Sequence, residues 1–153
     1  CELKPSLVMG SDHAGYAMKE YLKKKLKEQG FTIEDMGTDS EASVDAGIYA
    51  IEVAEEVAAH PQEKKGILIC GTGIGMSMNA NKVNGIRAAL VSDLFSAEMT
   101  RAHNDANVLC LGARVIAMPM AWEITKVWLK TEHLGGKYAV RVARMMDYEK
   151  KRK

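Results

Sequence analysis

Short apolar segments alternate along the chain with longer segments whose apolar residues recur at helical spacing. The apolar segments, which we predict to be strands, span residues 7–9, 66–70, 86–91 and 108–111, and a further strand, the second along the chain, starts with residues 31–33. The predicted helices span residues 16–29, 47–59, 76–81, 93–103, 119–130 and 137 onward. When helices alternate with strands, each helix returns the chain to the same end of the sheet, so the strands pair in parallel. The alternation therefore predicts an α/β fold, with a five-stranded parallel sheet covered by helices on both faces.

Length and composition indicate one ordinary globular domain. The 153 residues suffice for a single buried core, and neither a repeat nor a linker divides them, so we predict one domain over residues 1–153. The formal net charge is only +1, which argues against nucleic acid or a membrane surface as a partner. No apolar run is long enough to span a bilayer. The cysteines, Cys1, Cys70 and Cys110, have no paired or metal-type spacing, so we expect reduced thiols and a cytoplasmic protein.

Cys70 ends the third apolar segment and is followed at once by a glycine-rich run, residues 71–75. In a parallel sheet this thiol lies at the C-terminal tip of a buried strand, where open α/β sheets bind their ligands. The N–H groups of a glycine-rich turn can bind an anion or a developing oxyanion. The segment therefore combines a candidate base with charge-stabilising amides. Spacing alone leaves the alternative open, because most buried cysteines are inert.

Two further pairs of polar residues stand at the ends of predicted elements. Asp12 and His13 follow the first strand, where an aspartate commonly caps the next helix and a histidine can contact an anion. His103 and Asn104 end the helix after the fourth strand, where a histidine often interacts favourably with the helix dipole. Each position has both a structural and a functional interpretation.

Cations follow the fifth strand and line the last helix. Arg114 comes directly after the strand and points toward the edge that holds Cys70 if the sheet is parallel. Lys137, Arg141 and Arg144 are spaced by four and then three residues, which places them on one helix face. That face is either solvated surface or a phosphate clamp that reaches a neighbouring subunit.

The glycine-rich run does not match the common nucleotide-binding motifs. Its glycines are spaced G-x-G-x-G, with Met76 and Met78 where a third dinucleotide-type glycine would stand, and the lysine-serine or lysine-threonine pair of a P-loop is missing. No group of histidines, cysteines and carboxylates has metal-ligand spacing. We therefore expect neither a nucleotide cofactor nor a metal.

Taken together and in order, five motifs resemble the ribose-5-phosphate isomerase B family, which also holds the galactose-6-phosphate and allose-6-phosphate isomerases. The motifs are Ser11-Asp12-His13-Ala14-Gly15, the run from Gly66 to Ser77, Ala80-Asn81-Lys82, Gly85-Ile86-Arg87-Ala88 and His103-Asn104-Asp105-Ala106-Asn107. The resemblance implies a Rossmann-like α/β/α sandwich, a phosphorylated sugar as substrate and no metal or organic cofactor. It also implies a homodimer or a dimer of dimers, with active sites built from two chains and a C-terminal helix that reaches the partner subunit.

The resemblance also implies a role for each candidate site residue. Cys70 matches the base that moves a proton between C1 and C2, and Thr72 matches the hydroxyl that supports this step. His103 matches the residue that opens the furanose ring, with Asp12 at the other side of the sugar. The amides that match the anion hole for the enediolate belong to Gly71, Gly73, Gly75 and Ser77. The remaining substrate contacts are Asn104 to sugar hydroxyls, and His13, Arg114 and Arg141 to the phosphate. Lys137, on the same helix face as Arg141, is a further candidate for substrate binding.

Two segments depart from the family pattern. Asp45-Ala46-Gly47 stands where the family has Asp-Tyr-Pro, and Gly135-Gly136-Lys137-Tyr138 stands where it has Gly-Gly-Arg-His. Both changes concern recognition of the substrate. The first removes the tyrosine that packs on the sugar in the family, and the second replaces the forked guanidinium of an arginine with the point charge of Lys137. The sequence therefore predicts an isomerase of ribose 5-phosphate and ribulose 5-phosphate. The alternatives are the same reaction on a six-carbon sugar phosphate, or a sugar-phosphate sensor without turnover.

Overall fold

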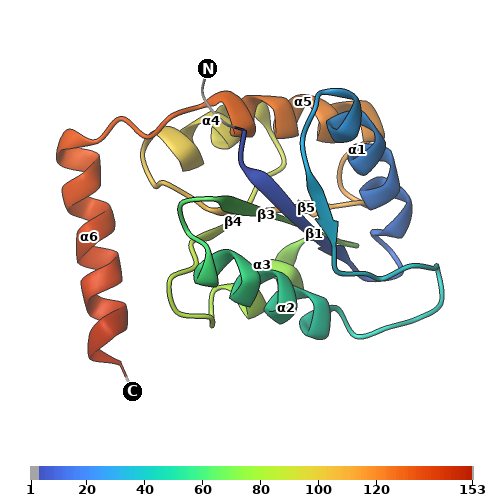
Figure 1. Cartoon of the computed structure of the whole chain (residues 1–153), viewed down its shortest axis with the longest axis horizontal. Coiled ribbons are helices and arrows are strands. Elements are labelled where there is room, and N and C mark those ends of the chain that lie inside the picture. The colour runs from blue at the N-terminus through green and yellow to red at the C-terminus, as the bar shows by residue number, and fades with distance from the viewer. Residues whose placement is uncertain (1–3, 153) are drawn as a thin grey trace.

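Five strands form one sheet in which every neighbouring pair is parallel (Figure 1). The structure, a computed structural model, describes residues 4–152. The strand order is β2-β1-β3-β5-β4. The strands are β1 (Ser6–Ser11), β2 (Ile33–Asp35), β3 (Lys64–Cys70), β4 (Ala88–Leu90) and β5 (Val108–Gly112). The predicted α/β fold with a five-stranded parallel sheet is confirmed.

Helices cover both faces of the sheet, and one helix stands apart (Figure 1). The first face carries α1 (Tyr16–Glu28), α4 (Leu94–Ala102) and α5 (Met118–Lys130), and the second carries α2 (Ala46–Ala59) and α3 (Ile74–Ala80). Side chains alternate along β1, so Leu7 and Met9 pack on the first face and Val8 on the second. These three side chains are fully buried, and each such burial contributes about 1.5–3 kcal/mol.

The second strand begins two residues later than the sequence pattern predicts. The N–H of Phe31 donates to the carbonyl of Leu26 at 3.1 Å and so belongs to the turn that ends α1. Gly30, with φ of +90°, makes that turn possible. Pairing with β1 therefore starts at Ile33, opposite Leu7. The predicted start of this strand at Phe31 is wrong, because the N–H of Phe31 is bound by the end of α1.

The chain leaves the two central strands toward opposite faces of the sheet. After β1 it enters α1 on the first face, and after β3 it enters α3 on the second (Figure 1). Loops that diverge in this way leave a crevice at the carboxyl ends of the strands, where such sheets bind ligands. The N–H of Asp12 donates to the carbonyl of Ile69 at 3.2 Å, so the two tips are in direct contact. The fold thus places the residues after β1 beside Cys70.

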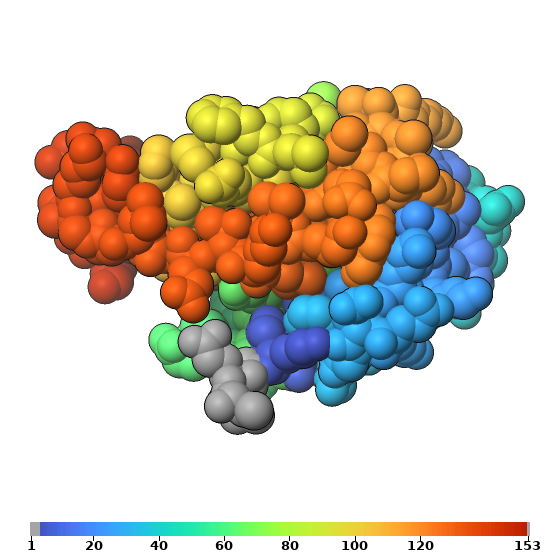
Figure 2. Space-filling model, turned by 90° about the horizontal axis from the view of Figure 1, so that it is seen from above, coloured from blue at the N-terminus to red at the C-terminus, as the bar shows by residue number. Residues whose placement is uncertain are grey.

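The last helix, α6 (Gly136–Lys151), stands beside the β4 edge and projects away from the sandwich. Figure 2 shows it from above, at the left, next to the end of α4. Its contacts with the body include the carboxylate of Glu149, which accepts from the N–H of Gly85 at 2.8 Å, and Val142, which is buried. A cleft of about 400 Å³ lies between α6 and the β4 edge. None of the helices within residues 4–152 has the length and hydropathy needed to cross a membrane.

Candidate functional site

The thiol of Cys70 faces the amides of the glycine-rich turn. Cys70 is the last residue of β3, and 6% of it is exposed. The N–H of Gly73 donates to its sulfur at an N–S distance of 3.1 Å. An N–H that points at sulfur stabilises negative charge there. The geometry therefore suits a thiolate at the carboxyl edge of the sheet.

The turn packs tightly against β4 and β5 at Gly73 and faces open space at Gly75. Gly73 has φ of +80°, and a Cβ there would lie 2.5 Å from Cδ1 of Leu90 and 3.0 Å from the backbone carbon of Leu111. A Cβ on Gly75 would meet no atom within 4 Å. Thr72 is exposed, and its hydroxyl oxygen accepts from the N–H of Ile74 at 3.3 Å. Space for a ligand therefore lies on the side of the turn that carries Gly75.

The amides of the predicted anion hole differ in their availability. The N–H of Gly73 is directed at the sulfur of Cys70. The N–H of Ser77 donates to the carbonyl of Gly73 at 3.1 Å, and its hydroxyl donates to the carbonyl of Ile74 at 2.8 Å. The N–H groups of a helix's first turn have no intrahelical acceptor, and Gly75 is the second residue of α3. The structure therefore favours Gly75 over Ser77 as an amide donor to a ligand.

Asp12 and His13 enter the site from the tip of β1. One carboxylate oxygen of Asp12 accepts from the N–H of Gly15 at 3.0 Å in the turn before α1. The N-cap of α1 is Gly15 itself, so the predicted N-cap role of Asp12 is wrong. Asp12 is only 9% exposed. Nδ1 of His13 accepts from the N–H of Val44 at 3.2 Å, so Nε2 carries the proton in the neutral ring. Asp12 thus holds the start of α1, and His13 retains a donor for an anion.

Arg114 lies across the start of the glycine-rich turn. The N–H groups of Ala113 and Arg114 donate to the carbonyls of Cys70 and Gly71 at 2.8 and 2.9 Å, which ties the end of β5 to the turn. The side chain of Arg114 comes within 3.4 Å of where a Cβ on Gly71 would lie. Together with the residues after β1 and β3, it completes the carboxyl-edge cluster: Asp12, His13, Cys70, Thr72 and Arg114.

The other predicted site residues lie at the opposite edge of the sheet. Helix α4 joins two parallel neighbours, so it runs from the carboxyl ends of the strands back to their amino ends. Its C-cap residue, His103, stacks on Tyr138 with ring centres 4.0 Å apart and an angle of 7° between the planes. The side chains of Lys137 and Arg141 lie over the same tyrosine ring. Together with the exposed Asn104, these residues form the amino-edge cluster: His103, Asn104, Lys137, Tyr138 and Arg141.

One chain does not bring the two clusters together. The five residues of β5 separate the edges by roughly 15 Å, the length of such a strand. A base must approach its proton to hydrogen-bond distance, about 3 Å. Cys70 and His103 of the same chain therefore cannot act on one small sugar.

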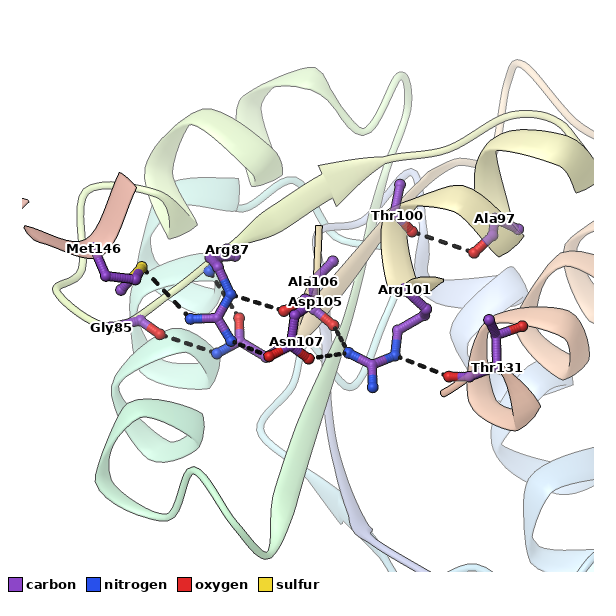
Figure 3. A network of polar contacts seen from close by, with 10 residues as sticks. All are labelled: Gly85, Arg87, Ala97, Thr100, Arg101, Asp105, Ala106, Asn107, Thr131 and Met146. Carbon is purple, nitrogen blue, oxygen red and sulfur yellow. Dashed lines mark hydrogen bonds and ion pairs between the residues drawn. The ribbon is translucent and has the colours of Figure 1, made fainter. Parts of the chain in front are cut away.

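Two arginines and an aspartate fix the loop that follows His103 (Figure 3). Nε of Arg87 donates to the backbone carbonyl of Asp105 at 2.7 Å. Nη1 of Arg101, a side chain only 7% exposed, donates to the carboxylate of Asp105 at 2.9 Å and to the carbonyl of Ala106 at 2.6 Å. Asp105 has φ of +50°, which few residues other than glycine adopt. Sequence reasoning missed this support, although the spacing of four between Arg101 and Asp105 indicates an ion pair at a helix end.

The segment that departs from the family at residues 45–47 leaves small side chains near the site. Asp45 caps α2 by accepting from the N–H of Gly47 at 2.9 Å. Tyr49, the nearest aromatic residue along the chain, packs on Gly37, where a Cβ would lie 2.7 Å from its ring. The Tyr49 side chain therefore lies beside the loop after β2.

Cys110 lies on the strand next to Cys70 but not opposite it. It pairs with Leu68, so the two cysteines are diagonal neighbours, whose Cα atoms are about 7–8 Å apart. A disulfide does not form across more than about 7 Å without backbone movement. Burial, and to a lesser degree the charge of Cys70, raises the pKa of the Cys110 thiol. Both thiols are free, and Cys1 lies outside the described residues. Within residues 4–152, no three histidines, cysteines or carboxylates are grouped to hold a metal.

Comparison with known proteins finds similarity along nearly the whole chain. A family model described as Ribose/Galactose Isomerase matches residues 7–145. The ribose-5-phosphate isomerase B of Escherichia coli K12 is 40% identical over 146 residues, which cover 95% of this chain and 97% of that protein. The structure of Clostridium thermocellum ribose-5-phosphate isomerase B is 44% identical with a TM-score of 0.92, covering 95% of this chain and 98% of that one. The structure of the Mycoplasma genitalium enzyme with bound ribulose 5-phosphate is 36% identical with a TM-score of 0.95, covering 99% and 100%.

Proposed function

The chain belongs to the ribose/galactose isomerase family, and we propose that it interconverts ribose 5-phosphate and ribulose 5-phosphate. The observation that carries the proposal is the thiol of Cys70, held at the tip of β3 with the N–H of Gly73 3.1 Å from its sulfur. Relatives named for this reaction, one of them with ribulose 5-phosphate bound, support the choice of sugar.

The first step opens the furanose ring of ribose 5-phosphate. The O1 hydroxyl loses its proton, the C1–O4 bond breaks as the C1 carbonyl forms, and O4 gains a proton. An imidazole can accept a proton on one nitrogen and donate one from the other, which suits His103 to this exchange. Asp12 faces the other side of the sugar and helps to hold it.

The second step moves a proton between C2 and C1. The Cys70 thiolate removes the C2 proton, the electron pair forms the C1–C2 double bond, and O1 becomes the enediolate oxygen. The thiol returns the proton to C1 while the proton on O2 passes to O1, with the exposed hydroxyl of Thr72 supporting this transfer. Amides of the turn, those of Gly71 and Gly75 first, stabilise the enediolate. One such donor is typically worth about 3 kcal/mol.

Cations bind the phosphate at the far end of the sugar. Arg114 and His13 approach it from the carboxyl-edge cluster, and Lys137 and Arg141 from the amino-edge cluster. Binding energy from this remote group orients the reacting carbons over the thiol. Asn104, exposed beside His103, contacts sugar hydroxyls.

Each active site is shared between two chains of a homodimer, either alone or within a dimer of dimers. The carboxyl-edge cluster of one chain meets the amino-edge cluster of the other, because a single chain holds them at opposite edges. Apolar side chains beside the glycine-rich turn support this arrangement: Ile74 is 50% exposed, Met78 66% and Phe95 72%. Helix α6 exposes Val140 and Met145, and we propose that it reaches the partner subunit.

Mixed dimers test the base and the shared site in one experiment. Cys70→Ala alone abolishes isomerisation while phosphate binding stays nearly intact, and His103→Asn alone slows turnover. When the two variants are mixed, each mixed dimer regains one site with an intact thiol and an intact imidazole. Random mixing makes about half of the dimers mixed, so activity returns to about a quarter of wild type. Near-wild-type turnover of Cys70→Ala rules out the thiol base, and mixing without recovery rules out the shared site.

A six-carbon sugar phosphate is the second candidate substrate, and the small side chains of Ala46 and Gly47 favour it because they leave room beside the sugar. Comparing kcat/KM for ribose 5-phosphate, allose 6-phosphate and galactose 6-phosphate decides between them. Binding of ribose 5-phosphate without turnover would instead indicate a sensor. We place the protein in the cytoplasm, which is supported by the free thiols of Cys70 and Cys110.

A further inference from the structure

The imidazole of His103 is held by a stacked tyrosine ring. The ring centres of His103 and Tyr138 are 4.0 Å apart, and the planes are within 7° of parallel. Among residues 4–152, neither nitrogen of this imidazole has a hydrogen-bond partner. Stacking is thus the contact that fixes the plane of the ring, and it leaves both nitrogens free to face a substrate.

The backbone around the stack joins the end of α4 to the start of α6. The N–H of Leu134 donates to the carbonyl of Ala102 at 3.0 Å, and the N–H of Tyr138 donates to the carbonyl of Gly135 at 3.0 Å. Gly135 and Gly136 have φ of +70° and +53°, a region that disfavours other residues. This double turn directs Tyr138 back onto His103 at the beginning of α6.

The same ring also contacts both cations of the amino-edge cluster. Nζ of Lys137 lies 5.2 Å from the ring centre of Tyr138, and Cζ of Arg141 lies 5.8 Å from it. Such distances are those of cation–π contacts. Tyr138 therefore contacts the imidazole and both cations, so it links the ring-opening group to the cations that we propose for the phosphate.

We propose that Tyr138 is a positioning residue for ring opening, acting through His103; this proposal rests on the function proposed above. The stacked ring restrains the imidazole so that its nitrogens meet the O1–H and O4 of the closed sugar. Proton transfer requires such restraint, since it proceeds only between groups at hydrogen-bond distance. Removal of the C2 or C1 proton by Cys70 does not involve the imidazole.

Hydrogen exchange separates ring chemistry from enolisation. The keto form of ribulose 5-phosphate is open-chain, because the hydroxyl that would close a furanose on C2 carries the phosphate. In heavy water, the enzyme places deuterium at C1 of ribulose 5-phosphate whenever an enediolate forms and returns. This exchange needs the thiol but no ring step. The measured quantity is the ratio of C1 deuterium incorporation to ribose 5-phosphate formation, followed by mass spectrometry.

We expect Tyr138→Ala to raise this ratio about tenfold, and His103→Asn about a hundredfold, as loss of a proton-transfer group typically costs. Tyr138→Phe keeps the stacked ring and restores the wild-type ratio. The double variant Tyr138→Ala/His103→Asn matches His103→Asn alone, because both changes act on one step. Tyr148→Ala removes an exposed tyrosine from the same helix and leaves the ratio unchanged. Thermal melting and dimer mass show whether each variant is folded.

The outcomes distinguish this proposal from the proposed function. If His103→Asn raises the ratio and Tyr138→Ala does not, Tyr138 has no positioning role while ring opening by His103 stands. If exchange and conversion fall together in Tyr138→Ala, the tyrosine serves only the general structure and the proposal is overturned. If His103→Asn leaves the ratio unchanged, ring opening by His103 is wrong and the proposal fails with it. Loss of exchange in Cys70→Ala confirms that the assay reports enolisation.

Discussion

Replacing Gly73 by alanine is the most direct test of how the catalytic turn is held. With φ of +80°, the backbone is in a region where a side chain costs about 1–2 kcal/mol. The new Cβ would lie 2.5 Å from Cδ1 of Leu90 and 3.0 Å from the backbone carbon of Leu111. The leucine side chain can turn away, but the strand backbone cannot. Overpacking of this kind adds about 1–3 kcal/mol. We expect the free energy of unfolding to fall by about 2–5 kcal/mol.

Gly75→Ala is the matched control, since it adds the same methyl group two residues away. Gly75 lies within α3, and a Cβ there meets no atom within 4 Å. Alanine in place of a helical glycine stabilises a protein by about 0.5–1 kcal/mol. The methyl group nevertheless enters the space where we propose that the sugar lies. The two variants should therefore change stability in opposite directions and both lower kcat/KM.

Urea denaturation followed by circular dichroism, together with a coupled isomerase assay, gives both quantities. Gly73→Ala should unfold at a lower urea concentration, and its kcat should fall because the N–H that faces the sulfur of Cys70 is displaced. An unchanged urea midpoint for Gly73→Ala would show that Leu111 does not confine the turn. Full kcat/KM in Gly75→Ala would show that the substrate binds elsewhere.

Two further predictions concern charges. Lys19 is fully buried, and its Nζ lies 2.7 Å from the carboxylate of Asp35. Asp35→Asn should therefore lower the free energy of unfolding by about 2–3 kcal/mol. This loss is smaller than for a fully buried ion pair, because the carboxylate of Asp35 is partly exposed. Glu20→Gln, at a more exposed partner, should cost under about 1 kcal/mol. Burial opposes ionisation of Asp35, but hydrogen bonds from Lys19, Lys23 and the N–H of Gly37 hold its pKa below the usual value. This contribution is therefore present above about pH 4 and is lost as the pH falls further, and an unchanged acid midpoint in Asp35→Asn would contradict it. Arg141→Ala should raise KM about tenfold with a smaller change in kcat. Lys150→Ala, at an exposed lysine in the last turn of α6, should leave KM unchanged. An unchanged KM in Arg141→Ala removes Arg141 from the phosphate site.

Local patterns were enough to predict the sheet, its parallel strands and the position of Cys70 at a strand tip. Alternating periodicity and glycine placement act over a few residues, so they are visible in the sequence. Asp45 caps α2 through short-range chemistry of the same kind, whereas Asp12, the N-cap that the sequence predicted for α1, lies three residues before the actual N-cap, Gly15. The start of β2 was harder to predict, because the N–H of Phe31 donates to the carbonyl of Leu26 at the end of the preceding helix.

The candidate site was predictable as a set of residues but not as an arrangement. Resemblance to the family predicts Cys70, Asp12 and His103 as site residues, and their roles stay predictions, yet their relative placement depends on strand order. The crossover through α4 carries His103 to the amino ends of the strands, so a second chain must supply the imidazole that acts with Cys70 in the site we propose.

Which helices and strands form, and which residue types stand at their ends, can be predicted from the sequence, since both depend on neighbours within one or two turns of chain. Which side chains meet depends on the packing of the folded chain. The stack of His103 on Tyr138 joins residues 35 positions apart, and of the two arginines that hold Asp105, Arg87 lies just before β4 and Arg101 lies on α4. Such contacts arise from how helices cross the sheet, and no local periodicity encodes that geometry.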